Sequence, residues 1–123
     1  MKRDMDLIRT LLLMAEEECG TEPLTQFEIE GYEDQEIYYH IELILQAGFV
    51  VGGISTTTTS EKKVVDNTIR SVTWEGHELL DMIRDPTIWD KTKTRLGDSI
   101  ESVGVAIILD VAKTIIKETL GLE

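Results

Sequence analysis

The sequence predicts a single α+β domain. A chain of 123 residues, 41% of them hydrophobic, can bury one modest core, which leaves no room for a second domain of the usual size. Apolar residues recur at helical spacing toward both ends, whereas two segments rich in β-branched residues lie in the middle. We expect residues 1–98 to form the main domain and residues 99–123 to add a helix that packs on it. Contact of that helix with a second chain is left open.

The first half of the chain predicts two helices separated by an extended segment. The helical spacing of leucines and isoleucines predicts a first helix over about Asp4 to Cys19. Phe27 and Ile29 then alternate with glutamates, as they would in a short edge strand. A second helix is predicted to begin at the segment Tyr32 to Asp34, whose carboxylates complement the helix dipole, and to end at Gly48.

A β-hairpin is predicted after the second helix. Most residues from Phe49 to Ile54 and from Thr68 to Thr73 are β-branched or small, which predicts two strands. The intervening residues 55–67 predict a long, mobile hairpin arm. The threonine run suits the solvated, extended part of that arm.

Two further helices are predicted directly after the hairpin. Thr73 is a suitable cap for the first, and the pair Asp85 and Pro86 both ends that helix and begins the next, which stops at Gly97. Both tryptophans, including Trp89, are expected in the core or at its margin. The predicted apolar side of the first of these helices contains Trp74, Leu79, Leu80 and Ile83.

The last predicted helix, from Ser99 to Leu120, has a surplus of apolar surface. Its apolar residues surround more of the helix than the ~100° stripe that covers one core. Asp110 and Lys113 argue against a membrane span, so we expect the surplus face to meet another protein chain, and a homodimer in particular. A wholly intramolecular role is the alternative. The candidate self-association residues are Ile108, Val111 and Ile115.

The order of helix, short strand, helix and two-stranded hairpin is that of a winged-helix domain, in which the second helix can lie in a DNA groove. Four stretches carry a more specific resemblance: Met1 to Arg9, Gly31 to Ile41, Leu45 to Val50 and Val72 to Asp85. Over Met1 to about Trp89 the chain resembles a family of phage- and prophage-associated domains of unknown function. This resemblance implies a winged-helix-like fold with extra C-terminal helices and a bacterial or phage source. It implies no activity.

The net charge of −12 disfavours nucleic acid as a partner, because such a field repels phosphates at long range. The predicted second helix contains no Lys or Arg, although a DNA-reading helix usually presents them to bases and phosphates. The candidate DNA contacts are instead in the arm: Lys62, Lys63 and Arg70. The simpler interpretation is that these residues keep the hairpin soluble and discourage edge-to-edge pairing.

The second helix carries the most distinctive side-chain cluster, which is a candidate anchor for a protein partner. The alternative is that one tyrosine is half-buried and the histidine is hydrogen-bonded inside the fold. The candidate partner-binding residues are Tyr38, Tyr39, His40 and Glu42.

The sequence contains no recognisable catalytic motif, phosphate-binding loop or metal-ligand pattern. His77 has only His40 as a second histidine, and Cys19 is the lone cysteine, so we expect no enzyme activity, metal or cofactor. The chain also lacks a long apolar run and the apolar core of a signal peptide, which predicts a cytoplasmic protein without a membrane partner.

Three functions are consistent with these observations. The first is a non-enzymatic protein-interaction module of phage or prophage origin. The second is a winged-helix regulator that binds DNA through the arm. The third is an acidic mimic of DNA, which follows from the net charge alone.

Overall fold

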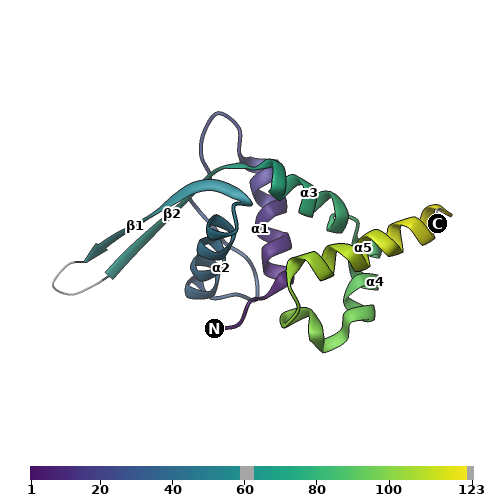
Figure 1. Cartoon of the computed structure of the whole chain (residues 1–123). Helices are drawn as coiled ribbons and strands as arrows, with labels where there is room; N and C mark the ends of the chain where they lie inside the picture. The colour runs from purple at the N-terminus through teal and green to yellow at the C-terminus, as the bar shows by residue number, and fades with distance from the viewer. Residues whose placement is uncertain (59–62, 122–123) are drawn as a thin grey trace.

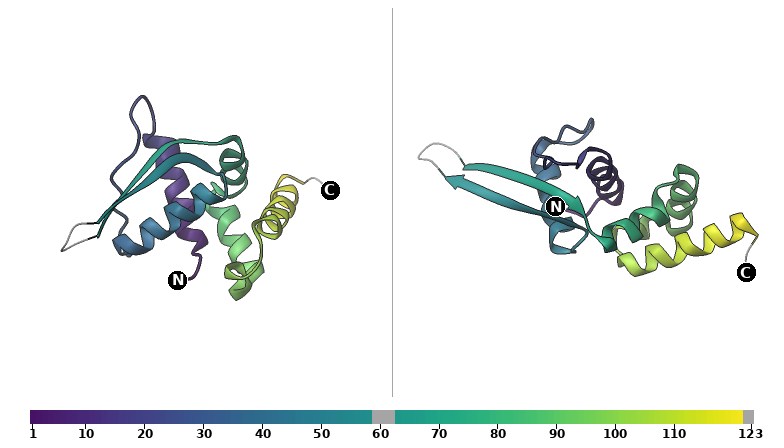
Figure 2. Two further views of the ribbon diagram at one scale, coloured as in Figure 1. Left: turned by 60° about the vertical axis from the view of Figure 1, so that its left-hand side comes forward. Right: turned by 90° about the horizontal axis from the view of Figure 1, so that it is seen from above.

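The computed structural model describes residues 1–58 and 63–121, and for Thr57 and residues 63–65 it describes the backbone only. The described residues form an α+β fold, as predicted. In Figure 1 the hairpin projects from the helical body on the side away from the C-terminus, and Figure 2 shows the same arrangement from two other sides. The elements are α1 (Met5–Glu18), α2 (Asp34–Gln46), β1 (Val50–Thr58), β2 (Lys63–Val72), α3 (Trp74–Ile83), α4 (Pro86–Leu96), the 3-10 helix η1 (Gly97–Glu101) and α5 (Val105–Leu120).

Helix α1 lies at the centre of the fold, where it contacts α2, β2 and α3 (Figure 1). The apolar residues that follow the helical period are buried, as the sequence predicted, whereas Leu13 and Met14 are half-buried. Full burial of a large apolar side chain contributes about 1.5–3 kcal/mol, so this helix supplies a large part of the core energy. The buried residues of α1 are Met5, Leu7, Ile8, Leu11, Leu12 and Ala15.

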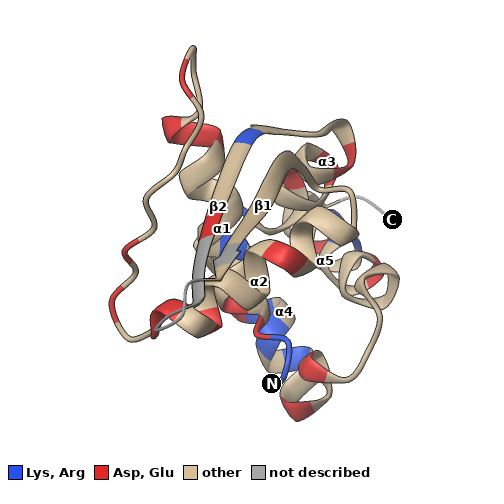
Figure 3. Cartoon of the chain, turned by 90° about the vertical axis from the view of Figure 1, so that its left-hand side faces the viewer, with Lys and Arg blue, Asp and Glu red and all other residues tan. Residues whose placement is uncertain are grey.

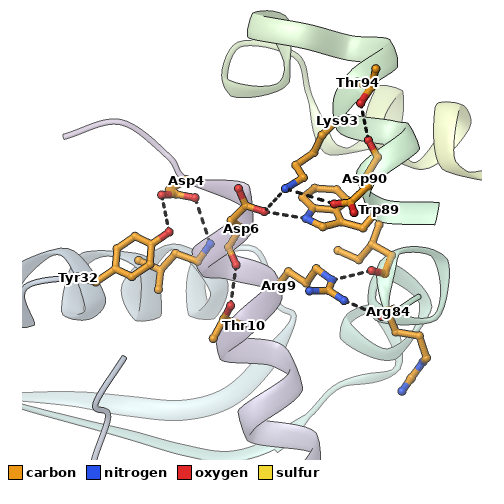
Figure 4. Close-up of polar contacts among 12 residues, drawn as sticks. Asp4, Asp6, Arg9, Thr10, Tyr32, Arg84, Trp89, Asp90, Lys93 and Thr94 are labelled. Carbon is orange, nitrogen blue, oxygen red and sulfur yellow. Dashed lines mark hydrogen bonds and ion pairs between the residues drawn. The ribbon is translucent and has the colours of Figure 1, made fainter. Parts of the chain in front are cut away.

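Two aspartates in the first turn of α1 connect this helix to distant parts of the chain (Figure 4). Asp4 caps α1 and also accepts a hydrogen bond of 2.9 Å from the hydroxyl of Tyr32, in the loop before α2. Burial and this carboxylate raise the pKa of Tyr32 to about 12. Asp6 accepts hydrogen bonds from Trp89 Nε1 at 2.8 Å and from Lys93 Nζ at 3.0 Å, which fixes α4 against α1.

The other end of α1 is tied to the end of α3. Arg9 donates to the carbonyl oxygens of Ile83 and Arg84, each at 2.7 Å, and so satisfies acceptors that the helix end leaves free (Figure 4). The guanidinium of Arg84 donates to both oxygens of Glu16, at 2.7 and 2.9 Å. These hydrogen bonds hold the pKa of Glu16 below its ordinary value.

The hairpin is longer than the sequence predicted. β1 and β2 pair antiparallel from Val50 opposite Val72 to Thr58 opposite Lys63, with a register shift between Val51 and Gly52. The two strands thus continue into the arm, whose conformation the sequence left open, since threonines and valines there continue the ladder as β-branched residues favour. Residues 59–62 lie outside the described part of the chain.

The predicted edge strand around Phe27 and Ile29 does not form. Instead, Leu24 makes a single antiparallel bridge to Ile69 on the outer edge of β2, through two hydrogen bonds of 2.8 and 2.9 Å. Beyond this bridge the chain leaves the sheet edge, and Phe27, which is 6% exposed, packs into the core. At this position the chain therefore buries the apolar side chain of Phe27 and does not form a strand.

Two predictions about the second half of the chain are wrong. Trp74 is 75% exposed, because it lies two residues before the buried Gly76 of α3, roughly 200° around the helix from it. Trp89, by contrast, is buried as predicted. The last helix begins at Val105 and not at Ser99, since a 3-10 turn and the N-cap Gly104 come first.

The predicted helix boundaries around α2, α3 and α4 are confirmed. Thr73 accepts a hydrogen bond from the Gly76 amide at the start of α3, and Asp85 accepts from the first amides of α4, where Pro86 is the first residue. α2 ends before Gly48, whose φ of 77° is a conformation that glycine adopts at low cost.

Replacement of Gly76 should destabilise the fold, because a Cβ at this position would overlap the carbonyl oxygen of Phe49 and a methyl group of Val72. We expect Gly76→Ala to lower the free energy of unfolding by about 1–3 kcal/mol, as overpacking does elsewhere. The matched control is Gly53→Ala, where a Cβ meets open space and the change should be neutral or stabilising by up to ~1 kcal/mol. Urea unfolding of both variants tests this, and equal stabilities would contradict the packing argument.

The ion pair between Glu16 and Arg84 should make stability depend on pH. The folded-state pKa of Glu16 is lowered, so its contribution is present above the unfolded-state pKa and is lost as the pH falls through the folded-state value. We expect Glu16→Gln to destabilise the protein near pH 7 by no more than ~1 kcal/mol, because the pair is partly exposed, and to have a smaller effect at an acidic pH below the folded-state pKa of Glu16. Thermal unfolding at both pH values measures it. Glu17→Gln, at an exposed position of α1, is the control and should have no comparable effect.

Candidate protein-binding groove

A groove lies between the outer side of α2 and the hairpin, and its volume is about 510 Å³. This volume falls within the range of about 300–1,000 Å³ that ligand sites usually occupy. The N-terminal residue and one residue of each strand complete the walls. The lining residues are Met1, Gln35, Tyr38, Tyr39, Glu42, Ile54 and Asn67.

The helical period brings the α2 residues of the groove together. Gln35, Tyr38 and Glu42 are spaced three and four residues apart, so they share one side of α2. The apolar residues Ile37 and Ile44 lie on the opposite side of the helix and are buried in the core. Tyr38 and Tyr39 are half-buried, and Glu42 is exposed. Three of the four predicted partner-binding residues therefore meet at one surface feature.

His40 does not belong to this surface. It is 1% exposed, and its Nε2 accepts a hydrogen bond of 2.8 Å from the Asp4 amide, so its Nδ1 carries the proton that is donated to the Glu36 carbonyl at 2.7 Å. Both ring nitrogens are thus satisfied inside the fold. The prediction of His40 as a partner-binding residue is wrong, and the alternative of a hydrogen-bonded interior histidine is correct.

Asn67 is the unusual residue of the groove. It is 4% exposed, and neither Nδ2 nor Oδ1 of its side chain has a hydrogen-bond partner among the described residues. Leaving a buried polar group unpaired costs about 1–3 kcal/mol. In β2, Asn67 lies on the same face as Ile69, two residues further on, which is fully buried. The Asn67 side chain therefore faces the domain, and its amide has hydrogen-bonding capacity that no described residue uses.

The charge around the groove is negative. The first turn of α2 contains Asp34 and Glu36, Glu33 caps the helix, and Glu42 lies at the groove. Figure 3 shows acidic residues along α2 and the long loop before it, and basic residues on the hairpin, on α4 and near the N-terminus, whose residue Met1 also lines the groove. A partner with basic side chains fits this field better than one with phosphates.

The candidate DNA-binding residues are not brought together as a described site. Arg70 is exposed and lines a shallow hollow of the hairpin that Asp66 also lines. Lys62 lies outside the described residues, and only the backbone of Lys63 is described.

Two of the three candidate self-association residues are interior residues of the chain itself. Ile108 and Ile115 are 0% and 1% exposed, because they form the core-facing side of α5, and Val111 is half-buried. The prediction of Ile108 and Ile115 as surface contacts is wrong. The apolar side chains that α5 exposes are Ile107 at 48% and Leu120 at 66%.

The hairpin side of the groove was not predicted from the sequence. Asn67 carried a signal, since asparagine is depleted in strands and lies here in a segment where most other residues are β-branched. Met1 and Ile54 carried no such signal in the sequence, because only the folded arrangement of the N-terminus, the hairpin and α2 places them at the groove. Within residues 1–58 and 63–121, no group of three or more His, Cys, Asp or Glu side chains is arranged to hold a metal ion, and no helix has the length and apolarity of a membrane span.

Comparison with known proteins adds the family. Residues 2–102 match the family described as "Hypothetical protein (DUF2513)". The chain belongs to the DUF2513 family. An uncharacterized protein from Haemophilus influenzae is similar over its full length, with 34% identity over 122 residues that make up 98% of this chain. No solved structure matches.

The expectation of a family of unknown function is thereby confirmed. The stretches that carried the resemblance lie within or overlap the part that matches DUF2513, and they supply structural contacts: Asp4 with Tyr32, the Asp4 amide with His40, and Gly76 against Phe49. None of these contacts forms the groove. These stretches also supply Met1, Gln35, Tyr38 and Tyr39 of the groove, whereas Glu42, Ile54 and Asn67 lie outside them.

Exposure along α5 gives a matched pair of substitutions. Ile108→Glu should unfold the protein or nearly so, because it buries a charge in a fully enclosed site, which is among the most destabilising changes known. Ile107→Glu, one residue earlier at a 48% exposed position, should leave the fold intact. Circular dichroism and thermal unfolding distinguish the two. A folded Ile108→Glu variant would disprove the assignment of this residue to the core.

Proposed function

We propose that this protein is a non-enzymatic protein-interaction module that binds a partner in the groove between α2 and the hairpin. The observation that carries this proposal is the groove itself, where Tyr38 and Tyr39 are half-buried beside the unpaired amide of Asn67. Tyrosines contribute large contact areas at low entropic cost and are enriched at binding hot spots. Glu42 supplies charge at the rim of the same groove.

The proposal includes a winged-helix-like arrangement and a phage or prophage origin. The first is supported by the element order α1, the Leu24 bridge, α2 and the β1–β2 hairpin. The second rests on the sequence resemblance described above. In this proposal, the helix that would read DNA in a winged helix serves a protein contact.

A DNA-binding role through the arm ranks second. α2 contains no Lys or Arg and has acidic residues in its first turn and at the groove, so the position of a reading helix carries the wrong charge. Arg70 is exposed and remains a candidate phosphate contact. The acidic mimic of DNA ranks third, because it rests on the net charge of −12 alone.

Self-association through α5 is a separate part of the proposal. It now rests on Ile107 and Leu120, which are exposed apolar residues. It does not require the groove, so the two contacts can be tested independently.

The groove should contact a partner protein in a bacterial host. We expect a photo-crosslinking amino acid placed at Glu42 to yield discrete protein adducts after irradiation of host cells that express the variant. The same group at Glu17, an exposed position on α1, is the matched control and should yield none of these adducts. The adducts are detected by their gel mobility, and mass spectrometry of the purified adducts identifies the partner.

Two results would count against the groove as a protein-binding site. Adducts that are equally abundant at Glu42 and Glu17 would indicate nonspecific proximity. Adducts with nucleic acid that form at Glu42 and disappear at high salt would favour the DNA-binding alternative.

A further inference from the structure

We propose that the groove binds an extended peptide segment that carries basic side chains, and that Asn67 pairs with the backbone of that peptide. This inference rests on the proposed function and names the chemistry of the partner. It starts from the one polar side chain of the groove that is both nine-tenths buried and without a partner among the described residues.

The carboxamide of Asn67 matches a peptide backbone. It offers an N–H donor and a carbonyl acceptor side by side, and an extended backbone offers one of each in return. Neither Nδ2 nor Oδ1 has a partner among the described residues, so the N–H and C=O of one residue in an extended segment, which point the same way, can satisfy both atoms at once. An isolated cation or a carboxylate would satisfy only one of them. Recognition through the backbone also tolerates varied peptide sequences, since side chains do not take part in it.

The position of Asn67 explains how a ligand would reach it. Asn67 lies opposite Ile54 in the hairpin, where neighbouring strands present paired side chains on one face. Ile54 is 41% exposed and lines the same groove. Because the amide is buried, a peptide reaches it only when a side chain of the groove wall turns aside, and the exposed Ile54 opposite Asn67 is the candidate for this movement.

The carboxylate of Glu42 at the groove favours a peptide with basic side chains. Glu42 lies at the groove beside Tyr38 and Tyr39, and α2 has no basic residue to oppose a cation. A Lys or Arg can place its charged end near the carboxylate while its aliphatic stem packs on an aromatic ring. A nucleobase could also pair with an asparagine amide, but its phosphates would enter a negative field. The combined features therefore favour a basic peptide over a nucleotide.

The test is selection from a library of displayed random peptides against the immobilised full chain. We expect selected peptides to be enriched in Lys and Arg. For the synthesised peptides, Asn67→Leu should weaken binding by about tenfold, because two hydrogen bonds to a buried amide are lost. The same variant should unfold at a temperature no lower than the parent chain, because it removes an unpaired polar group. Should Asn67→Leu not fold, Asn67→Ala replaces it.

Two further variants separate the peptide contact from a general effect on the protein. Glu42→Gln should weaken binding and reduce its salt dependence, since it removes the carboxylate that faces the cation. Glu75→Gln, at an exposed position of α3 outside the groove, should leave the affinity unchanged. Loss of affinity in this control would overturn the assignment of the charge contact to Glu42.

The outcomes also separate this inference from the proposed function. Unchanged affinity in a folded Asn67→Leu variant would overturn the backbone contact, and the protein-binding groove would stand. A selection without basic peptides, in a protein that still crosslinks to a partner at Glu42, would overturn the peptide ligand alone. Preferential binding of a single-stranded oligonucleotide probe would overturn it in favour of a nucleotide. Failure of both the selection and the crosslinking would remove the inference and the proposed function together.

Discussion

The first turn of α1 fixes how the helices of this protein are arranged. Asp4 binds the Tyr32 hydroxyl through its side chain and the His40 ring through its amide, while Asp6 accepts from Trp89 in α4. A hydrogen bond to a charged group contributes about 1.5–3 kcal/mol and a neutral one about 0.5–1.5 kcal/mol, no more than one buried leucine or isoleucine, and α1 alone buries six apolar residues. Apolar burial therefore stabilises the core, and the polar contacts decide the orientation of α2 and α4 about α1.

The groove follows from this arrangement. His40 anchors α2 from the inside through the Asp4 amide, so the helix can turn only one side, with Tyr38 and Glu42, toward solvent. The hairpin then covers that side, because the bridge between Leu24 and Ile69 attaches the outer edge of β2 to the domain. The groove is thus bounded by α2 and the hairpin, and each of these elements is held in place by contacts that lie outside the groove.

Periodicity predicted the elements well because it reflects local geometry. The apolar residues of α1, the caps Thr73 and Asp85 and the end of α2 at Gly48 all depend on neighbours within one or two turns. The errors arose where distant contacts decide the outcome. Phe27 packs in the core instead of extending a strand, Ile108 is covered by the chain itself, and His40 is satisfied by an amide 36 positions away. Asn67 could be noticed in the sequence, but only the packing of the hairpin over α2 shows that its amide is buried without a partner.

The side chains that are already engaged inside the fold indicate, by contrast, where a ligand of this protein can bind. The stretches that carried the resemblance include Asp4, Tyr32, His40 and Gly76, each of which is engaged by an interior contact. Residues that already satisfy one another inside the fold have little capacity left for a ligand. The amide of Asn67 keeps its full capacity at a cost of about 1–3 kcal/mol, which a fold with stabilising apolar residues available at this position would avoid. The proposed peptide would satisfy this polar side chain, so the hairpin side of the groove, with Ile54 and Asn67 outside the stretches that carried the resemblance, is the first place to test.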